Sequence, residues 1–145
     1  ELKKLGGISY TDEENLFAKE LYNTLLNPDS VIGDQRLVQP LVLTQSKGST
    51  DVGDVSWKVP TSGVRIATWV PGTSAHSWQA VAAGGTTIGT KGSTLAAKTL
   101  ANSAVRLFEN PSLIDLSWAE HKENIGDHQY EALLGDREPP LDYRK

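Results

Sequence analysis

The 145-residue chain lacks cysteine, lacks methionine and contains no long apolar run. Without cysteine it has no disulfide framework and no thiolate chemistry. No segment approaches the roughly 20 apolar residues that span a bilayer and no signal-peptide pattern is present, so we expect no membrane partner. Basic residues number 14 against 18 acidic ones, so the chain also lacks the positive surface that nucleic-acid binding requires.

The missing methionine matters for a second reason, because translation begins with one. We therefore expect a chain that has been processed or that forms part of a longer polypeptide. A chain of 145 residues suits one globular domain, which buries roughly two-thirds of its unfolded surface. We expect residues 1–126 to form the folded segment and residues 127–145 to form an extended tail.

Three segments have helical patterns. Residues 11–26 begin with a capping box between Thr11 and Glu14 and continue with apolar residues at four-residue spacing. Residues 84–109 and 111–126 follow, the latter with proline at its first helical position. The apolar face expected for the longer of these two consists of Ala96, Leu100, Ala104, Leu107 and Phe108.

Four short runs favour strands, because they are rich in apolar, mostly β-branched or aromatic residues, and glycine or proline bounds the clearest of them. They are residues 41–43, 52–57, 64–70 and 78–82. Helices that flank several short strands predict an α/β fold, with a short mixed sheet packed against helices.

Two carboxylates, Asp51 and Asp54, stand three residues apart within Gly48–Trp57. Such a run usually forms a turn in which a short carboxylate accepts hydrogen bonds from the backbone. The alternative is a loop that directs an acid at a metal-bound histidine or at a substrate.

A lone histidine, His76, follows in a loop of small residues between Trp69 and Trp78. Such an imidazole more often packs or forms a hydrogen bond than binds metal. A loop that follows a predicted strand is nevertheless where scaffolds mount functional groups, and imidazole is a common ligand of transition metals.

Two other patterns carry less weight. The glycine-rich run 84–93 looks like a phosphate-binding loop, but its lysine does not directly follow the second glycine and no Ser or Thr directly follows that lysine. The pairs Glu120-His121 and Asp127-His128 could bind metal, but a helix end and its exit commonly carry solvated polar residues, so we expect both pairs to be solvated.

The order and spacing of these segments resemble the carboxy-terminal part of the aminobenzoyl-glutamate utilisation protein B group, within the aminoacylase/carboxypeptidase-like metallopeptidase family. The resemblance covers roughly residues 1 to 110. The segments that carry it are Gly48–Trp57, Pro71–Thr73, His76–Gln79, Lys91–Gly92 and Leu95–Ala101.

This resemblance implies that the chain is the carboxy-terminal half of a metallopeptidase-type catalytic domain. His76 matches the last metal ligand of the family. Asp54 matches an acid beside the metals, although Asp51 fits the same place, and we assign both a supporting role. The residues that the resemblance places near the substrate are Gly72, Thr73, Ser74 and Lys91.

The family's other metal ligands have no counterpart here. Its His-x-Cys-Gly-His motif is missing, and the Glu13-Glu14 pair lies in the first turn of a helix, where capping accounts for it. A catalytic metal needs about three protein ligands, and a two-metal site needs more. The chain alone is therefore expected to bind metal weakly or not at all, and to be inactive.

The sequence thus predicts part of a metal-dependent amidohydrolase. The parent protein would cleave the amide bond of an N-acyl amino acid, a dipeptide or an aminobenzoyl-glutamate-like compound, with zinc or manganese as cofactor. Its amino-terminal half would be the partner, in a homo- or hetero-oligomer, and the expected compartment is the cytoplasm. The alternative is a non-catalytic binding or interaction module.

Overall fold

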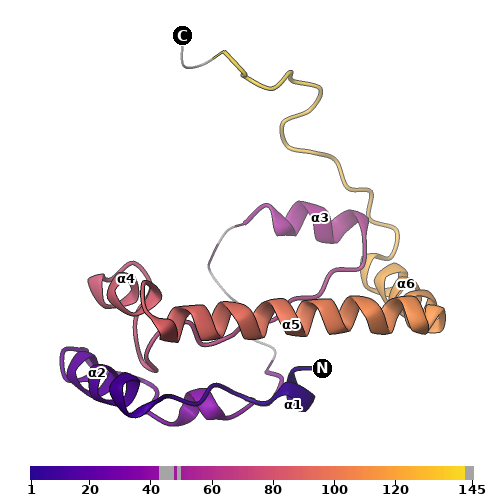
Figure 1. Cartoon of the computed structure of the whole chain (residues 1–145). Coiled ribbons are helices and arrows are strands. Elements are labelled where there is room, and N and C mark those ends of the chain that lie inside the picture. Colours follow the sequence, from indigo (N-terminus) through magenta and orange to yellow (C-terminus); the bar gives the residue numbers. More distant parts are fainter. Residues whose placement is uncertain (43–47, 49, 143–145) are drawn as a thin grey trace. The chain divides into compact units, whose positions relative to one another are not determined.

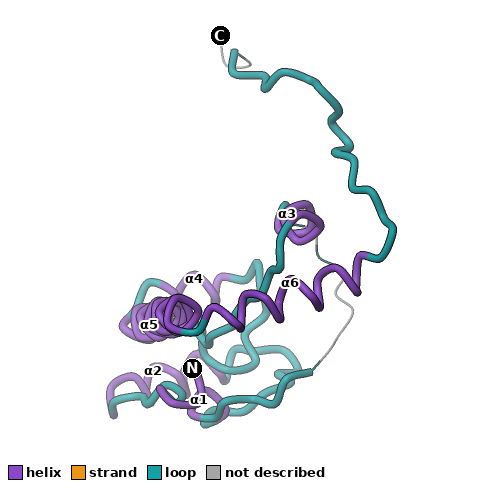
Figure 2. The backbone as a smooth tube through the Cα atoms, turned by 90° about the vertical axis from the view of Figure 1, so that its right-hand side faces the viewer, coloured by secondary structure: helices purple, strands orange, loops and turns teal. Residues whose placement is uncertain are grey.

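The computed structural model describes residues 1–42, 48 and 50–142, and all regular structure within them is helical (Figures 1 and 2). The chain divides into two compact units. The first consists of Glu1–Thr44 and Gly63–Glu109, and the second of Gln45–Ser62 and Asn110–Lys145. Within the described ranges, no helix has the length and apolarity needed to cross a membrane.

The first unit is built on short helices, one long helix and irregular segments. Its elements are α1 (Leu2–Leu5), α2 (Asp12–Tyr22), a 3₁₀ turn (Asp34–Arg36), α4 (Trp78–Gly84) and α5 (Thr87–Glu109). Its core collects side chains from α2, α4, the start of α5 and two irregular segments. The buried members of that core are Ile8, Tyr10, Ala18, Leu21, Val70, Ala83 and Ile88.

Helix α2 begins as the sequence predicts. The Thr11 hydroxyl accepts the backbone N–H of Glu14 at 3.2 Å, and the Glu14 carboxylate accepts the backbone N–H of Thr11 at 2.8 Å, which completes the capping box. The helix ends at Tyr22, earlier than predicted, and Asn27 takes a left-handed conformation with φ 51°.

Glycines allow α5 to approach its neighbours closely. A Cβ atom at Gly89 would overlap the carbonyl oxygen of Gly84, at the end of α4. One turn later, a Cβ atom at Gly92 would lie 2.5 Å from the carbonyl oxygen of Ala67. The first half of α5 therefore packs directly on backbone, and this packing holds it against α4 and against residues 67–68.

The predicted α/β fold with a mixed sheet is wrong, because the described residues contain no strand. Residues 52–57 lie in α3 (Val52–Lys58), and residues 78–82 lie in α4. Residues 64–70 and residues 41–42 have no regular secondary structure, and residue 43 lies outside the described residues. Strand propensity mostly reflects packing against neighbouring strands, and these runs have none.

The apolar residues of the 64–70 run pack into the core although the run forms no strand. Val70 is 1% exposed, and Ile66, Ala67 and Trp69 pack against the core as partly buried side chains. The run thus supplies apolar side chains to a helical core without forming a ladder of backbone hydrogen bonds.

The apolar face predicted for α5 is not the face that the helix buries. The buried residues of this helix are Ile88, Gly89, Gly92 and Thr99. Beyond them the helix leaves the core, and Leu100 and Phe108 are 56% and 83% exposed. The alanine-rich pattern identified the helix but not the face that it buries.

The second unit contains α3 and α6 (Pro111–Ile125). Helix α6 has proline at its N-terminus and ends at Gly126, which has φ 58°, as the sequence predicts. No residue of α6 is buried. Residues 127–142 form neither helix nor strand.

The close packing of α5 gives a first prediction. Gly89→Ala should lower the free energy of unfolding by about 2 kcal/mol or more, because its methyl group meets backbone that cannot move aside. Gly85→Ala is the matched control, since Gly85 has φ −79° and its added Cβ would make ordinary contact at 3.6 Å. Urea unfolding followed by circular dichroism measures both, and equal midpoints would contradict the packing described here.

Candidate functional site

A buried carboxylate, Glu14, joins three parts of the first unit. Besides the backbone of Thr11, it accepts hydrogen bonds from the Thr87 hydroxyl at 2.5 Å and from the Lys91 ammonium at 2.5 Å. Glu14 is 7% exposed. The Lys91 ammonium also donates to the Ser9 carbonyl at 3.1 Å. One side chain of α2 therefore fixes the first turns of α5 and the segment that precedes α2.

These contacts decide the ionisation of Glu14. Burial raises the pKa of its carboxyl group, but the hydrogen bonds from Lys91, Thr87 and the Thr11 backbone outweigh burial and hold that pKa at about 2. Tyr10 responds in the opposite sense, because burial and the nearby Glu14 charge raise its pKa to about 12. Glu14 is thus an anion at neutral pH, and Lys91 is its counterion.

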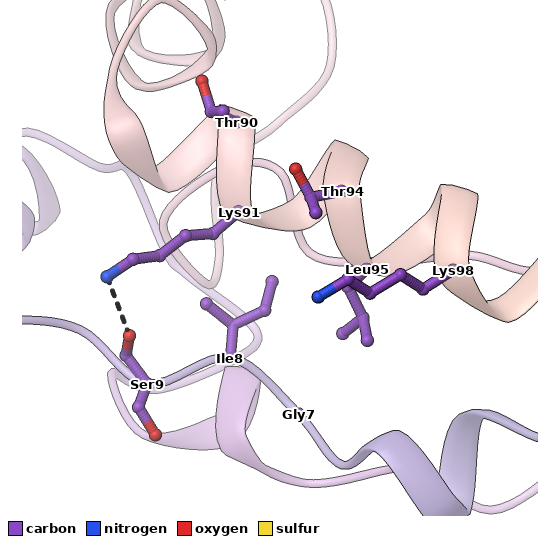
Figure 3. A pocket seen from close by; sticks show the side chains of 8 residues that line it. All are labelled: Gly7, Ile8, Ser9, Thr90, Lys91, Thr94, Leu95 and Lys98. Carbon is purple, nitrogen blue, oxygen red and sulfur yellow. Dashed lines mark hydrogen bonds between the residues drawn. The ribbon is translucent and has the colours of Figure 1, made fainter.

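A groove of about 300 Å³ lies beside this network, between residues 7–9 and α5 (Figure 3). Its wall at residues 7–9 is held by the backbone N–H of Ile8, which donates to the Gln35 carbonyl at 2.8 Å. The residues that line it are Gly7, Ile8, Ser9, Thr90, Lys91, Thr94, Leu95 and Lys98. The groove combines an apolar floor with two ammonium groups.

Lys91, predicted to lie near a substrate carboxylate, thus lines this groove with its ammonium bound to a carboxylate of the chain itself. Sequence analysis did not identify Lys98 as a groove residue or Glu14 as the partner of Thr87 and Lys91. The sequence does contain a pattern that groups the residues of α5 involved. Thr87, Lys91, Thr94 and Lys98 follow one another at spacings of four, three and four, which places them on one face of a helix.

His76 lies on the turn that leads into α4. Its φ of 59° is left-handed, its side chain is exposed, and the following Ser77 caps α4 by accepting the backbone N–H of Ala80 at 3.2 Å. Across the described residues, the imidazole has no hydrogen-bond partner. The turn therefore presents this ring to solvent from a position fixed by the helix behind it.

The neighbours predicted to line a pocket wall lie in the segment just before this turn. Gly72 has φ 80°, and its Cβ would meet the Pro28 side chain at 2.5 Å. The Thr73 hydroxyl is buried and has no partner among the described residues. The Ser74 carbonyl accepts the hydroxyl of Ser77 at 2.7 Å. Their assignment to substrate binding stays a prediction.

Asp51 and Asp54 belong to the second unit, where they stand at the start of α3. Asp51 occupies the N-cap position without a side-chain capping bond. Asp54 accepts the Tyr130 hydroxyl at 2.6 Å. The next turn of α3 holds the same segment, because Lys58 Nζ lies 4.9 Å from the Tyr130 ring and the Trp57 and His128 rings are 4.4 Å apart. Asp54 thus anchors part of the predicted tail to α3.

No three His, Asp or Glu side chains in the described part of the chain lie close enough together to hold a metal ion. His76 therefore has no set of co-ligands there, and these residues do not by themselves fit a catalytic metal. The assignment of His76 as a single ligand stays a prediction.

Comparison with known proteins gives one curated relative. It is the B subunit of p-aminobenzoyl-glutamate hydrolase from Escherichia coli strain K12, which is 32% identical over 156 residues. The match covers 89% of this chain and 32% of the relative. This chain is a homologue of that hydrolase subunit. The resemblance to the aminobenzoyl-glutamate utilisation group is therefore confirmed, and the chain spans about a third of the length of the relative it matches.

No protein-family model matches the chain, and no solved structure matches it. The relationship to the E. coli protein thus rests on sequence alone. The relative's name describes a hydrolase built from subunits.

The Glu14 network gives a second prediction, on acid stability. Its pKa is about 2 in the folded chain against an ordinary 4.5, so its contribution to stability is complete above pH 4.5 and is lost as the pH falls toward 2. Lys91 is 36% exposed, so solvent screening limits this contribution to about 1–2 kcal/mol.

Unfolding by urea at a series of pH values tests this. Glu14→Gln should lower stability at pH 7 and flatten the loss between pH 5 and pH 2. Glu13→Gln, its exposed neighbour in α2, should keep the wild-type profile. A Glu14→Gln variant with the wild-type pH dependence would show that this carboxylate does not stabilise the fold.

Proposed function

We propose that this chain is the carboxy-terminal part of a metal-dependent amidohydrolase that cleaves the amide bond of an aminobenzoyl-glutamate-like substrate. The observation that carries the proposal is the homology to the E. coli hydrolase, which extends over nearly the whole chain. N-acyl amino acids and dipeptides contain the same amide bond and are further candidate substrates. Following the same resemblance, we place the parent protein in the cytoplasm.

In this proposal the chain contributes His76 as one ligand of a zinc or manganese ion. The remaining ligands and the general base come from polypeptide outside this chain. The ring suits that role because it is exposed and because Ser77 and α4 fix the turn that bears it. Asp51 and Asp54 would orient groups around the site, and Gly72, Thr73 and Ser74 would form its wall.

The apolar surface of the first unit supports the proposal that another polypeptide covers it. Only eight apolar residues are buried in the described chain, whereas the second half of α5 exposes four large ones. They are Leu100, Val105, Leu107 and Phe108, with exposed fractions of 56%, 53%, 40% and 83%. Patches of this kind on soluble proteins usually mark surfaces that another polypeptide covers.

The third prediction concerns His76 in the parent protein. An antibody against this chain should detect a polypeptide of about three times 15.7 kDa in the source cells, since the chain matches about a third of its relative.

In that polypeptide, His76→Asn should abolish hydrolysis of aminobenzoyl-glutamate and leave the fold intact. Asparagine tolerates the left-handed backbone but does not replace imidazole as a ligand.

His121→Asn, on α6, is the control and should leave turnover unchanged. Near-normal activity of His76→Asn would remove this residue from the site. A native polypeptide of only 15.7 kDa would instead favour the non-catalytic module.

The fourth prediction concerns the exposed face of α5. The isolated chain should bind a hydrophobic dye such as ANS and should self-associate, because Leu100 and Phe108 are not covered within it. The double substitution Leu100→Ser and Phe108→Ser should reduce both effects without lowering the unfolding midpoint. Dye fluorescence and analytical ultracentrifugation measure these properties, and a monomer that binds no dye would contradict this part of the proposal.

A further inference from the structure

The groove between residues 7–9 and α5 carries one positive charge that the described residues do not neutralise. Lys91 is paired with Glu14 at 2.5 Å. Lys98 also lines the groove, and no carboxylate of the described chain lies within 4.0 Å of its ammonium. The charge of Lys91 is therefore neutralised by Glu14, whereas the charge of Lys98 is available to a ligand.

Hydrogen-bond donors accompany this charge. An ammonium group has three N–H donors, and Lys91 uses two of them, on Glu14 and on the Ser9 carbonyl. Thr94, one helical turn before Lys98, lines the same groove. Figure 3 shows the Lys98 side chain extending beside Leu95, with its ammonium toward the groove that Ile8 also lines. The donors therefore border an apolar surface formed by two aliphatic side chains.

We propose that this groove binds a small organic monoanion, namely a carboxylate attached to an apolar body. The carboxylate pairs with Lys98, with the third N–H of Lys91 as a further donor, and the apolar body covers Ile8 and Leu95. A volume of about 300 Å³ stands at the lower limit for small-molecule sites, which restricts the body to about the size of one ring. A second negative charge is disfavoured, because Lys91 is already neutralised and Glu14 is close by.

This inference does not rest on the proposed hydrolase function, because neither His76 nor a metal takes part in it. Lys98 has a direct role, whereas Lys91 mainly shapes the groove through its bond to Glu14. The site thus differs from one in which both lysines would bind a dianion.

Benzoate binding to the 145-residue chain tests the proposal, by calorimetry and by NMR shifts of ¹⁵N-labelled protein. Benzoate should bind and shift the amides of residues 7–9 and 90–98, whereas neutral benzamide should bind about tenfold more weakly. Acetate should also bind more weakly, because it lacks the apolar body. Lys98→Gln should weaken benzoate binding about tenfold, and Lys98→Arg should retain it within about threefold.

Lys19→Gln removes an exposed lysine of α2 that does not line the groove, and should bind benzoate as the wild type does. Benzamide or acetate binding as tightly as benzoate would overturn the proposal. So would unchanged affinity in Lys98→Gln, shifts that map away from the groove, or no binding at all. Because the fold is monitored in the same spectra, loss of binding through unfolding is recognised directly.

Discussion

The buried carboxylate of Glu14 is the central constraint on the first unit. A carboxylate that is 7% exposed would destabilise the fold unless it were fully paired. Its partners come from the backbone at the start of α2 and from two residues on one face of α5. A helix of eleven residues and a helix of 23 residues are thus joined by one side chain, close to the point where Gly89 and Gly92 bring α5 against its neighbours.

The same constraint shapes the groove. Lys91 is held against Glu14 and Ser9, so its charge is neutralised and its position is fixed. Lys98 lies two turns further along α5, and no carboxylate of the described chain lies within 4.0 Å of its ammonium. A polar face of one helix is therefore divided into a structural half, at Thr87 and Lys91, and a half that is open to a ligand, at Thr94 and Lys98.

Sequence patterns identified elements whose signals are local. The capping box of α2 and the proline and glycine that bound α6 are satisfied within a few residues, so they hold regardless of tertiary context. The prediction of strands was wrong because a strand forms only against a partner strand, which the local sequence does not specify. Val70 fills the core of this unit, but it does so from an irregular segment. The strand predicted for residues 64–70 is therefore wrong, although Val70 is an apolar residue that suits the core.

The candidate site shows the same division. The sequence predicted a loop at His76, and the residue lies on a turn, whereas its role as a metal ligand stays a prediction. The long-range bond between Glu14 and Lys91 joins residues 77 positions apart and has no local signature. Explaining Glu14 by capping alone was correct but incomplete. The oxygen that caps the helix, Oε2, also accepts a hydrogen bond from Lys91, and Oε1 accepts one from the Thr87 hydroxyl. A carboxylate with several such partners is fixed as an anion and is unsuited to carry protons at neutral pH. In the amidohydrolase that we propose, the acid–base group therefore lies outside this network, in polypeptide beyond this chain.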